Sequence, residues 1–273
     1  MNRFLERFGP WAVVTGASSG IGEAFARRLA ETGMGLVLIA RRENRLRQLA
    51  DELQSRHSIS VRVVAADLSA GDFLALVDRA THDLKVGLLV NNAGIATTGS
   101  FLDNDIASEL AMLHLNNRAR LILAHHFGRS MRKQGRGGII FVSSTVAFAG
   151  VPSWSNYAAS KAHDLIFAEG LARELRKDGV SVLALCPGFT RTELLPPGSR
   201  PFFPMRPDAV VNTALRKLGR RTTAVAGWLN RIIVFSTRFL PRSWNARVFG
   251  WVVRRTFKGV PREAQVPRSA TPV

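Results

Sequence analysis

A tyrosine and a lysine stand four positions apart, at Tyr157 and Lys161, and Ser144 precedes the tyrosine by thirteen residues. On a helix, residues four apart lie on one face and about 6 Å apart along the axis. An ammonium group held there is expected to lower the pKa of the phenol, so that the phenol exchanges a proton near neutral pH. A serine hydroxyl beside it can hold a substrate oxygen by a hydrogen bond. A Tyr-x-x-x-Lys step is common on its own, so its meaning depends on the residues that precede it.

A glycine-rich turn follows the first apolar run, at residues 11–14, and a helical pattern opens directly after it at Glu23. A strand, a glycine turn and a helix form the setting in which backbone N–H groups receive a phosphate. The spacing differs from the common Gly-x-Gly-x-x-Gly pattern, and the alternative is a plain turn between a strand and a helix. Three glycines and two serines together favour a dinucleotide site. The turn reads Thr15-Gly16-Ala17-Ser18-Ser19-Gly20-Ile21-Gly22.

Further motifs occur in order along the chain. They are Asn91-Asn92-Ala93-Gly94, Asn116, Ser144, Tyr157-x-x-x-Lys161 and Pro187-Gly188-x-x-x-Thr192. Together with the glycine turn, they resemble the classical short-chain dehydrogenase/reductase family, and the resemblance covers about residues 8 to 195. Any one motif could arise by chance, whereas six in register are specific. The general pattern is similar to that of the family's 3-oxoacyl and 17β-hydroxysteroid reductases.

The resemblance implies an oxidoreductase in which a nicotinamide cofactor exchanges hydride with a carbonyl or alcohol carbon. Ser144 and Tyr157 would hydrogen-bond the substrate oxygen, and Tyr157 would deliver the proton as a general acid. Lys161 would keep Tyr157 acidic and contact the nicotinamide ribose. Asn116 would help a water molecule to connect Lys161 with solvent, although Asn117 leaves an ambiguity of one residue. The expected cofactor-binding residues are Gly16, Ser18, Ser19, Gly20, Ile21, Gly22, Arg41, Arg42, Asp67, Leu68, Asn92, Ala93, Gly94, Tyr157, Lys161, Pro187, Gly188 and Thr192.

The end of the second expected strand bears on the choice of cofactor. An NAD-selective site places a carboxylate there to accept hydrogen bonds from the ribose 2′-OH. This sequence has Ala40 at that position, followed by Arg41 and Arg42, and guanidinium groups suit a 2′-phosphate. The alternative is that both arginines are ordinary solvated charges. We predict NADP(H), with Asp67 contacting the adenine, although an aspartate after a strand is more often a helix cap.

Short apolar segments alternate with longer amphipathic ones, which is the pattern of a parallel sheet covered on both faces. The predicted fold class is α/β, with a single Rossmann-like doubly wound parallel sheet and a C-terminal amphipathic helical extension. We expect the catalytic core in residues 1–195, a substrate lid and basic helical extension in 196–260, and a flexible tail in 261–273. Strands are expected at 11–15, 35–40, 61–65, 87–91, 138–143 and 180–186, and helices at 21–32, 43–56, 71–81, 104–132, 155–178 and 207–218.

Composition limits the compartment and the cofactors. The chain has 273 residues, a length that fits one large α/β domain, and a single cysteine, Cys186. One cysteine excludes an internal disulfide framework and indicates a reducing compartment, so we expect a cytoplasmic protein. No window approaches the roughly 20 apolar residues of a membrane-spanning helix. His125 and His126 would point to different faces of a helix, without ligand spacing, so no metal site is predicted.

The C-terminal third is strongly basic, with fourteen lysines and arginines against one acid in residues 200–262. On a helix from 228 to 240, the apolar residues share one broad face, and Arg231 and Arg238 lie off it. Such helices bind in the plane of an anionic membrane surface, which would place the protein on the inner face of a membrane. The same apolar face could instead close over the substrate pocket or form a subunit interface. Pro241 predicts two helices rather than one. Nucleic-acid binding is not expected, because nothing resembles a base-reading module.

Two functions follow from these observations. The first is a reversible NADP(H)-dependent reductase of a small hydrophobic carbonyl, such as a 3-oxoacyl, steroid-like or other lipid-derived ketone. The alternative is a catalytically weak protein that keeps the nucleotide-binding fold and acts as a sensor or scaffold at a membrane surface. The complete set of four catalytic residues favours the enzyme, because a pure binding protein has no need of all four. By resemblance, we expect a homodimer or homotetramer that assembles through the helices near 104–132 and 155–178.

Overall fold

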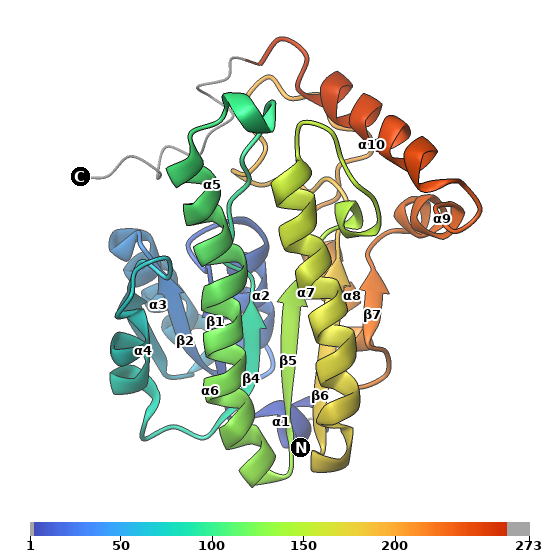
Figure 1. Cartoon of the computed structure of the whole chain (residues 1–273). Coiled ribbons are helices and arrows are strands. Elements are labelled where there is room, and N and C mark those ends of the chain that lie inside the picture. Colours follow the sequence, from blue (N-terminus) through green and yellow to red (C-terminus); the bar gives the residue numbers. More distant parts are fainter. Residues whose placement is uncertain (1–2, 261–273) are drawn as a thin grey trace.

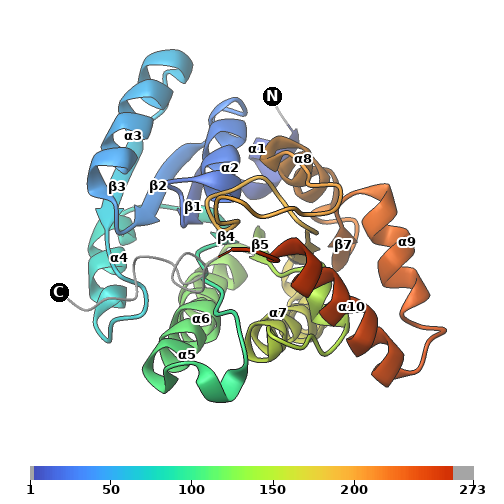
Figure 2. The ribbon, with the colours of Figure 1, turned by 90° about the horizontal axis from the view of Figure 1, so that it is seen from above.

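Seven parallel strands form one sheet, and helices cover both of its faces (Figures 1 and 2). The computed structural model describes residues 3–260. The strands are β1 (Trp11–Thr15), β2 (Gly35–Ala40), β3 (Val61–Ala65), β4 (Val86–Asn91), β5 (Gly137–Val142), β6 (Val180–Cys186) and β7 (Thr223–Val225). Their order across the sheet is β3-β2-β1-β4-β5-β6-β7. The strands are added toward one edge as far as β3, and from β4 onward they are added toward the other edge, starting beside β1. This is the doubly wound arrangement that the sequence predicts.

Most of the helices pack in two layers against the sheet (Figure 2). They are α1 (Arg3–Phe8), α2 (Gly20–Ala30), α3 (Glu43–His57), α4 (Phe73–Thr81), α5 (Ile106–Leu113), α6 (Ala119–Gln134), α7 (Ser155–Glu174), α8 (Pro207–Lys217), α9 (Trp228–Ser236) and α10 (Arg242–Thr256). The helices α2, α3 and α8 cover one face of the sheet, and α4, α6 and α7 cover the other. Neighbouring strand residues face opposite layers: Ile140 of β5 packs into the first core and Ile139 into the second. A strand that is buried on both faces explains the continuous apolar runs of the sequence.

The predicted strands agree with the structure to within one residue, but two predicted helices are interrupted. The helix expected over 104–132 divides into α5 and α6, separated by a π-helical turn at His114–Arg118. A π turn inserts an extra residue into the helix, which redirects the side chains that follow it. The helix expected over 155–178 ends at Glu174 and continues as a 3₁₀ turn. The short elements α1 and β7 were not expected.

The two C-terminal helices are separate, as Pro241 predicts. The first is shorter than the expected 228–240, because α9 ends at Ser236 and tight turns follow it, such as the bond from Thr237 N to Val234 O. The second helix, α10, lies across the carboxyl end of the sheet (Figures 1 and 2). The predicted tail at 261–273 lies outside the described residues.

Candidate active site

The turn after β1 forms a tight cradle at the start of α2. Gly16 and Gly20 adopt left-handed backbone angles, with φ of 67° and 60°. A Cβ atom on Gly22 would lie 2.2 Å from the carbonyl oxygen of Gly16, so only glycine allows this close packing. Ser19 precedes the helix, and its side chain makes no capping hydrogen bond to the first turn. The N–H groups of that turn therefore face the groove without a side-chain acceptor, which is the arrangement that suits a phosphate.

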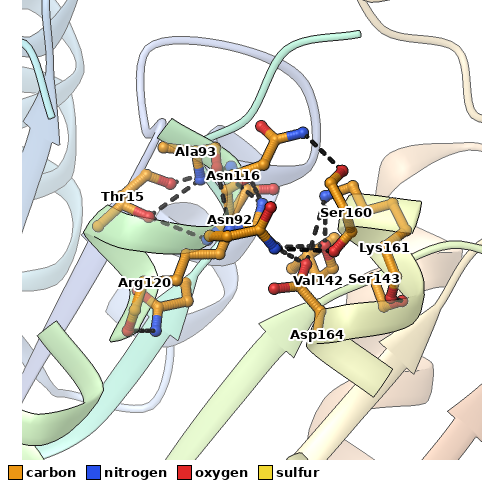
Figure 3. A network of polar contacts seen from close by, with 12 residues as sticks. Thr15, Asn92, Ala93, Asn116, Arg120, Val142, Ser143, Ser160, Lys161 and Asp164 are labelled. Carbon is orange, nitrogen blue, oxygen red and sulfur yellow. Dashed lines mark hydrogen bonds and ion pairs between the residues drawn. The ribbon is translucent and has the colours of Figure 1, made fainter. Parts of the chain in front are cut away.

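Thr15 joins this cradle to the loop after β4. Its hydroxyl accepts hydrogen bonds from the backbone N–H groups of Asn92, at 2.9 Å, and Ala93, at 3.0 Å (Figure 3). The side chain of Asn92 donates back to the carbonyl oxygen of Thr15 at 2.9 Å. Gly94 follows in the same loop, where a Cβ atom would lie 2.9 Å from Oδ1 of Asn116. The structure thus places the two predicted cofactor loops side by side at the carboxyl end of the sheet.

Ser144, Tyr157 and Lys161 meet where β5 ends and α7 begins. Oγ of Ser144 accepts a hydrogen bond from Val146 N and caps a 3₁₀ turn, which orients the hydroxyl next to α7. Tyr157 and Lys161 lie one turn apart on α7, and both are buried, with exposed fractions of 7% and 4%. Nζ of Lys161 donates to the carbonyl oxygen of Val142 at 3.0 Å. It also lies 5.7 Å from the centre of the Tyr157 ring.

The spacing of Tyr157 and Lys161 predicts a lowered pKa of the phenol, but burial raises it instead. Burial raises the pKa of Tyr157 to about 12, against the opposing charge of Arg120 and a hydrogen bond with Ser144. Burial also lowers the pKa of Lys161 to about 7, and the positive charge of Arg120 acts in the same direction. A buried site disfavours the charged form of each group. The influences on the pKa of Tyr157 are burial, Arg120, Asp164 and Ser144, so the structure does not bear out the expected lowering by the ammonium of Lys161.

Asn116 is fully buried and lies in the π-helical turn. Its Oδ1 accepts from Ile95 N at 3.0 Å, and its Nδ2 donates to Ile95 O at 2.9 Å and to Oγ of Ser160 at 3.1 Å (Figure 3). The side chain therefore fixes the loop after β4 against α7. Asn117 also contacts α7, through a bond of 2.9 Å to Ser160 O. The buried position of Asn116 fits the predicted role better than a surface amide does.

Of the two arginines after β2, Arg42 contacts both the glycine turn and an acidic residue. Nη2 of Arg42 donates to Oγ of Ser18 at 3.0 Å and to Oγ of Ser19 at 2.8 Å. Its Nη1 pairs with the carboxylate of Glu193 at 2.6 Å. Arg41 is exposed at the same edge. Burial opposes the charge of Glu193, but hydrogen bonds from Arg45 and Arg42 outweigh burial and hold the pKa of that carboxyl below its ordinary value.

The remaining predicted residues lie around the same edge of the sheet. Asp67 closes its own turn by accepting from the backbone N–H and hydroxyl of Ser69 at 2.9 and 2.6 Å, and Leu68 is buried in the core. Gly188 lies against Asn230, 2.6 Å from the place of a Cβ atom. Thr192 lies over Gly20. Pro187 contributes a carbonyl oxygen that accepts from Thr145 N at 2.9 Å.

Tyr157 belongs to an aromatic cluster centred on Trp154. The ring of Trp154 lies 5.3 Å from the Tyr157 ring, 6.2 Å from Phe189 and 5.3 Å from Phe257. Val253 of α10 belongs to the same buried cluster. One side of α10 therefore packs into the same cluster as Tyr157. A groove of about 810 Å³ runs from the start of α2 along residues 191–208.

Sequence reasoning missed two buried charged residues of this site, Arg120 on α6 and Asp164 on α7. A signal was present: Arg120 shares a helix face with the apolar Leu123 and Phe127, three and seven positions later. A charge on a core-facing stripe is unusual and indicates a buried partner. The sequence alone does not show which residue that partner is.

Comparison with known proteins agrees with this geometry. A family model described as short chain dehydrogenase matches residues 10–199. The chain belongs to the short-chain dehydrogenase family. It is 32% identical over 237 residues to a 7beta-hydroxysteroid dehydrogenase of Mediterraneibacter gnavus, which covers 84% of this chain and 90% of the relative.

Two solved structures resemble this member of the family closely. One comes from work on 7beta-hydroxysteroid dehydrogenase stereoselectivity and has a TM-score of 0.86 at 30% identity, covering 92% of this chain and 100% of that one. The other, a short-chain dehydrogenase from Sphingobium yanoikuyae in complex with NADPH, has a TM-score of 0.74 at 35% identity, covering 80% and 87%. Family membership makes this chain a nucleotide-binding oxidoreductase that interconverts carbonyl and alcohol groups. Within residues 3–260, no helix combines the length and apolar character needed to cross a bilayer.

Proposed function

We propose that this short-chain dehydrogenase is an NADP(H)-dependent enzyme that reversibly reduces a bulky, apolar ketone, with a steroid-like or lipid-derived carbonyl as the substrate class. The observation that supports this most is the surroundings of Tyr157. The ring of Trp154 packs against that of Tyr157, and the rings of Phe189 and Phe257 pack against Trp154. An apolar substrate would replace water beside this cluster without losing hydrogen bonds. The similarity to a 7beta-hydroxysteroid dehydrogenase supports the same class of substrate.

The residues of the glycine cradle fit a dinucleotide. The uncapped first turn of α2, the close approach of Gly22 to Gly16 and the neighbouring loop at Asn92 provide backbone donors and space for a pyrophosphate. When bound, NADPH supplies the hydride for the carbonyl carbon. Gly188 and Thr192 would line the nicotinamide side, and Asp67 with Leu68 would border the adenine. Lys161 would contact the nicotinamide ribose.

The chain's own residues would supply position and the proton. Ser144 would hold the carbonyl oxygen of the substrate by a hydrogen bond, and Tyr157 would give its phenolic proton to the oxygen as negative charge develops there. The ammonium of Lys161 would stabilise the phenolate left behind, and Asn116 would order a water path that returns a proton. One hydride and one proton convert the ketone to the alcohol, and the reverse steps oxidise the alcohol.

The preference for NADP(H) rests on the end of β2. Ala40 offers no carboxylate for a ribose 2′-OH, and Arg42 holds its guanidinium on the hydroxyls of Ser18 and Ser19. Glu193 accepts hydrogen bonds from this guanidinium, so its carboxylate stands in for an anion at the place where a 2′-phosphate would bind. A 2′-phosphate would therefore compete with Glu193 for Arg42, and Arg41 would add a second positive charge.

We also propose that α9 and α10 hold the protein on an anionic membrane surface. The two helices and the turn between them expose a group of large apolar side chains, here called the C-terminal apolar surface: Trp228, Ile232, Ile233, Phe235, Phe239, Leu240, Trp244, Val248 and Trp251. Exposed arginines surround these residues, among them Arg231, Arg238 and Arg247. Pairing of this surface with a second copy would bring like charges together, whereas anionic lipid would neutralise them. The expected dimer or tetramer would form elsewhere, where Ile106, Leu110 and Ile166 are exposed on α5 and α7.

The alternative function, a nucleotide-binding scaffold at a membrane, would need the same surface but no turnover. A single experiment separates the two: NADPH oxidation is followed with bulky ketones, such as a ketosteroid and a long-chain 3-oxoacyl thioester, and with short polar ketones as the comparison. The proposed enzyme turns over the bulky ketones with higher kcat/KM and uses NADPH in preference to NADH. Tight NADPH binding without turnover of any ketone would favour the scaffold.

A further inference from the structure

A buried ion pair joins α6 to α7 directly beside Lys161 (Figure 3). Arg120 is 2% exposed and Asp164 is 1% exposed, and the guanidinium donates to the carboxylate. The same carboxylate oxygen lies 3.7 Å from Nζ of Lys161. Asp164 is therefore shared between two cations, of which one is the lysine of the proposed catalytic set.

Arg120 also connects the elements that form the site. Its Nη2 donates to Ala93 O at 2.7 Å and to Asn92 O at 3.2 Å, and its Nη1 donates to Val142 O at 2.9 Å. Lys161 donates to this same Val142 oxygen. One guanidinium thus contacts the nucleotide loop after β4, the end of β5 and, through the ion pair, α7. Any shift of Arg120 would move the cofactor loop relative to the lysine.

A buried ion pair is weak evidence for a contribution to stability. Moving two charges out of water is costly, and apolar residues of similar volume often replace a buried ion pair without loss of stability. Arg120 lies between apolar neighbours on α6, and its guanidinium gives the backbone carbonyls of the site a donor that an apolar side chain would lack. The location of the pair, within contact of a catalytic lysine and a cofactor loop, indicates a role at the site.

We propose that Arg120 and Asp164 are positioning residues of the active site: Arg120 is a permanent positive charge behind Tyr157 and Lys161, and Asp164 is the counter-ion that keeps the Lys161 ammonium beside it. This inference rests on the proposed function, in which Lys161 acts as an ammonium. It adds a second cation to the tyrosine and lysine pair. Neither residue touches the reacting atoms.

The charges that face Lys161 shift its pKa in opposite directions. Arg120, from α6, lowers the pKa of Lys161, whereas Asp164 on α7 and Cys186 on β6 raise it, and burial is the largest effect. On α7, Tyr157 lies beside the lysine and His163 lies two positions after it. Val142 at the end of β5 contributes its carbonyl oxygen, and Ser143 follows β5. Arg120 is also the strongest influence that lowers the pKa of Tyr157. Removal of one partner should therefore shift the titration of Lys161 in one direction, and removal of the other should shift it in the opposite direction.

The pH dependence of kcat/KM, with NADPH and a bulky ketone, tests the proposal. Asp164→Asn removes a negative charge, so Lys161 loses its proton at lower pH. The fall of kcat/KM at alkaline pH, here called the alkaline limb, should therefore begin about one to three pH units lower. Arg120→Gln keeps amide donors for the loop carbonyls but removes a positive charge near the Lys161 ammonium, so the alkaline limb moves to higher pH. Arg120→Lys keeps the charge and leaves the limb near its original pH. Arg132→Gln on α6 and Glu174→Gln on α7, both at exposed positions, are matched controls that leave the alkaline limb unchanged.

A second measurement needs no turnover. Because the folded-state pKa of Lys161 lies below its ordinary value of 10.5, the unfolded chain binds more protons between about pH 7 and 10.5, and the free energy of unfolding rises with pH over that window. Asp164→Asn should move the start of this rise to lower pH and Arg120→Gln to higher pH, and Lys161→Met should abolish both shifts.

The outcomes are distinct. A fall in stability with no shift of either the kcat/KM limb or the unfolding curve would overturn the proposal, because the pair would then be only a packing element. If Asp164→Asn does not fold, the volume-conserving double variant Arg120→Met/Asp164→Leu replaces it, and its limb should lie between those of the single changes. Absence of NADPH-dependent turnover in the unmodified protein would reject the proposed function instead, while the unfolding series still tests the charge balance.

Discussion

At the scale of single residues, Tyr157 lies between opposing influences. Its aromatic surroundings favour the neutral phenol, and its pKa of about 12 keeps the proton on the oxygen until a substrate oxygen accepts it. Ser144 hydrogen-bonds the phenol, and Nζ of Lys161 lies 5.7 Å from the centre of its ring. This arrangement suits a general acid, which must arrive protonated and give up its proton only as charge develops on the substrate.

Replacement of Tyr157 by Phe should remove the proton and keep the ring packed against Trp154. We expect ketone reduction to fall by roughly 10²–10⁴-fold, the range typical of losing a general acid. The affinity for NADPH, measured by fluorescence titration, should change little, because the cradle at the start of α2 is untouched. Near-normal turnover in this variant would contradict the assigned proton donor.

Cofactor choice is also decided by single side chains. Arg42→Ala should remove a charge-assisted contact and weaken NADPH binding by about 1.5–3 kcal/mol, or roughly 10- to 150-fold. The binding of NADH should weaken much less. Arg41→Ala should act in the same direction. Glu193→Gln removes the carboxylate that competes for Arg42, so it should strengthen NADPH binding. Isothermal titration with both cofactors decides the matter, and a preference of the unmodified protein for NADH would refute the assignment.

Some residues of the site were predictable from spacing and others were not. Ser144, Tyr157 and Lys161 form a local pattern, because two of them share a helix and the third stands at a strand end. Arg120 and Asp164 are 44 positions apart on different helices, and only tertiary packing brings them together. A pattern of spacing records local geometry, whereas a buried ion pair depends on how the helices dock.

At the scale of elements, the sheet was predictable and the helix breaks were not. Strands appear as apolar runs between turn residues, so their bounds follow from composition. The π turn between α5 and α6 leaves no such mark, because it lies within one continuous helical pattern and depends on the buried bonds of Asn116 to Ile95, which only the folded chain forms. The short strand β7 is stabilised by pairing with β6 rather than by its own sequence.

The helix α10 has two faces with different surroundings. Val253 and Phe257 pack into the cluster around Tyr157, and Trp251 on the outer side is 52% exposed. We therefore interpret α10 as a lid over the substrate site. This interpretation and the membrane interpretation are compatible, because they use opposite sides of one helix.

A conservative change on the inner face tests the lid. Phe257→Leu removes the ring contact with Trp154 and should raise KM for a bulky ketone about tenfold, with a loss of stability of roughly 1–2 kcal/mol. Reduction of a small ketone should change little. Trp251→Leu, on the outer face of the same helix, is the matched control and should leave both substrates unaffected. An equal loss for bulky and small ketones would indicate a general packing defect rather than a lid.

At the scale of the whole molecule, charge is distributed unevenly. The chain carries a formal net charge of +18, and the basic excess lies largely in its C-terminal third, next to the C-terminal apolar surface. Elsewhere many arginines are paired with acids, as Arg27 is with Glu52 and Arg62 with Asp83. An anionic bilayer would therefore orient the molecule with α9 and α10 toward the lipid. The mouth of the site, which α10 borders, would then open close to the membrane, where apolar ketones concentrate.

Vesicle binding tests this orientation. The double reversal Arg231→Glu/Arg238→Glu replaces two charges of about 1 kcal/mol each with repulsive ones, so binding to anionic vesicles should fall at least about 30-fold. The reversal Arg129→Glu/Arg132→Glu makes the same change in net charge on exposed positions of α6, and it should lower binding far less. Co-sedimentation is measured at low and moderate salt, because apolar insertion persists where charge attraction is screened. Equal losses in both double variants would mean that net charge alone draws the protein to lipid, and equal partition onto neutral and anionic vesicles would exclude charge from the mechanism.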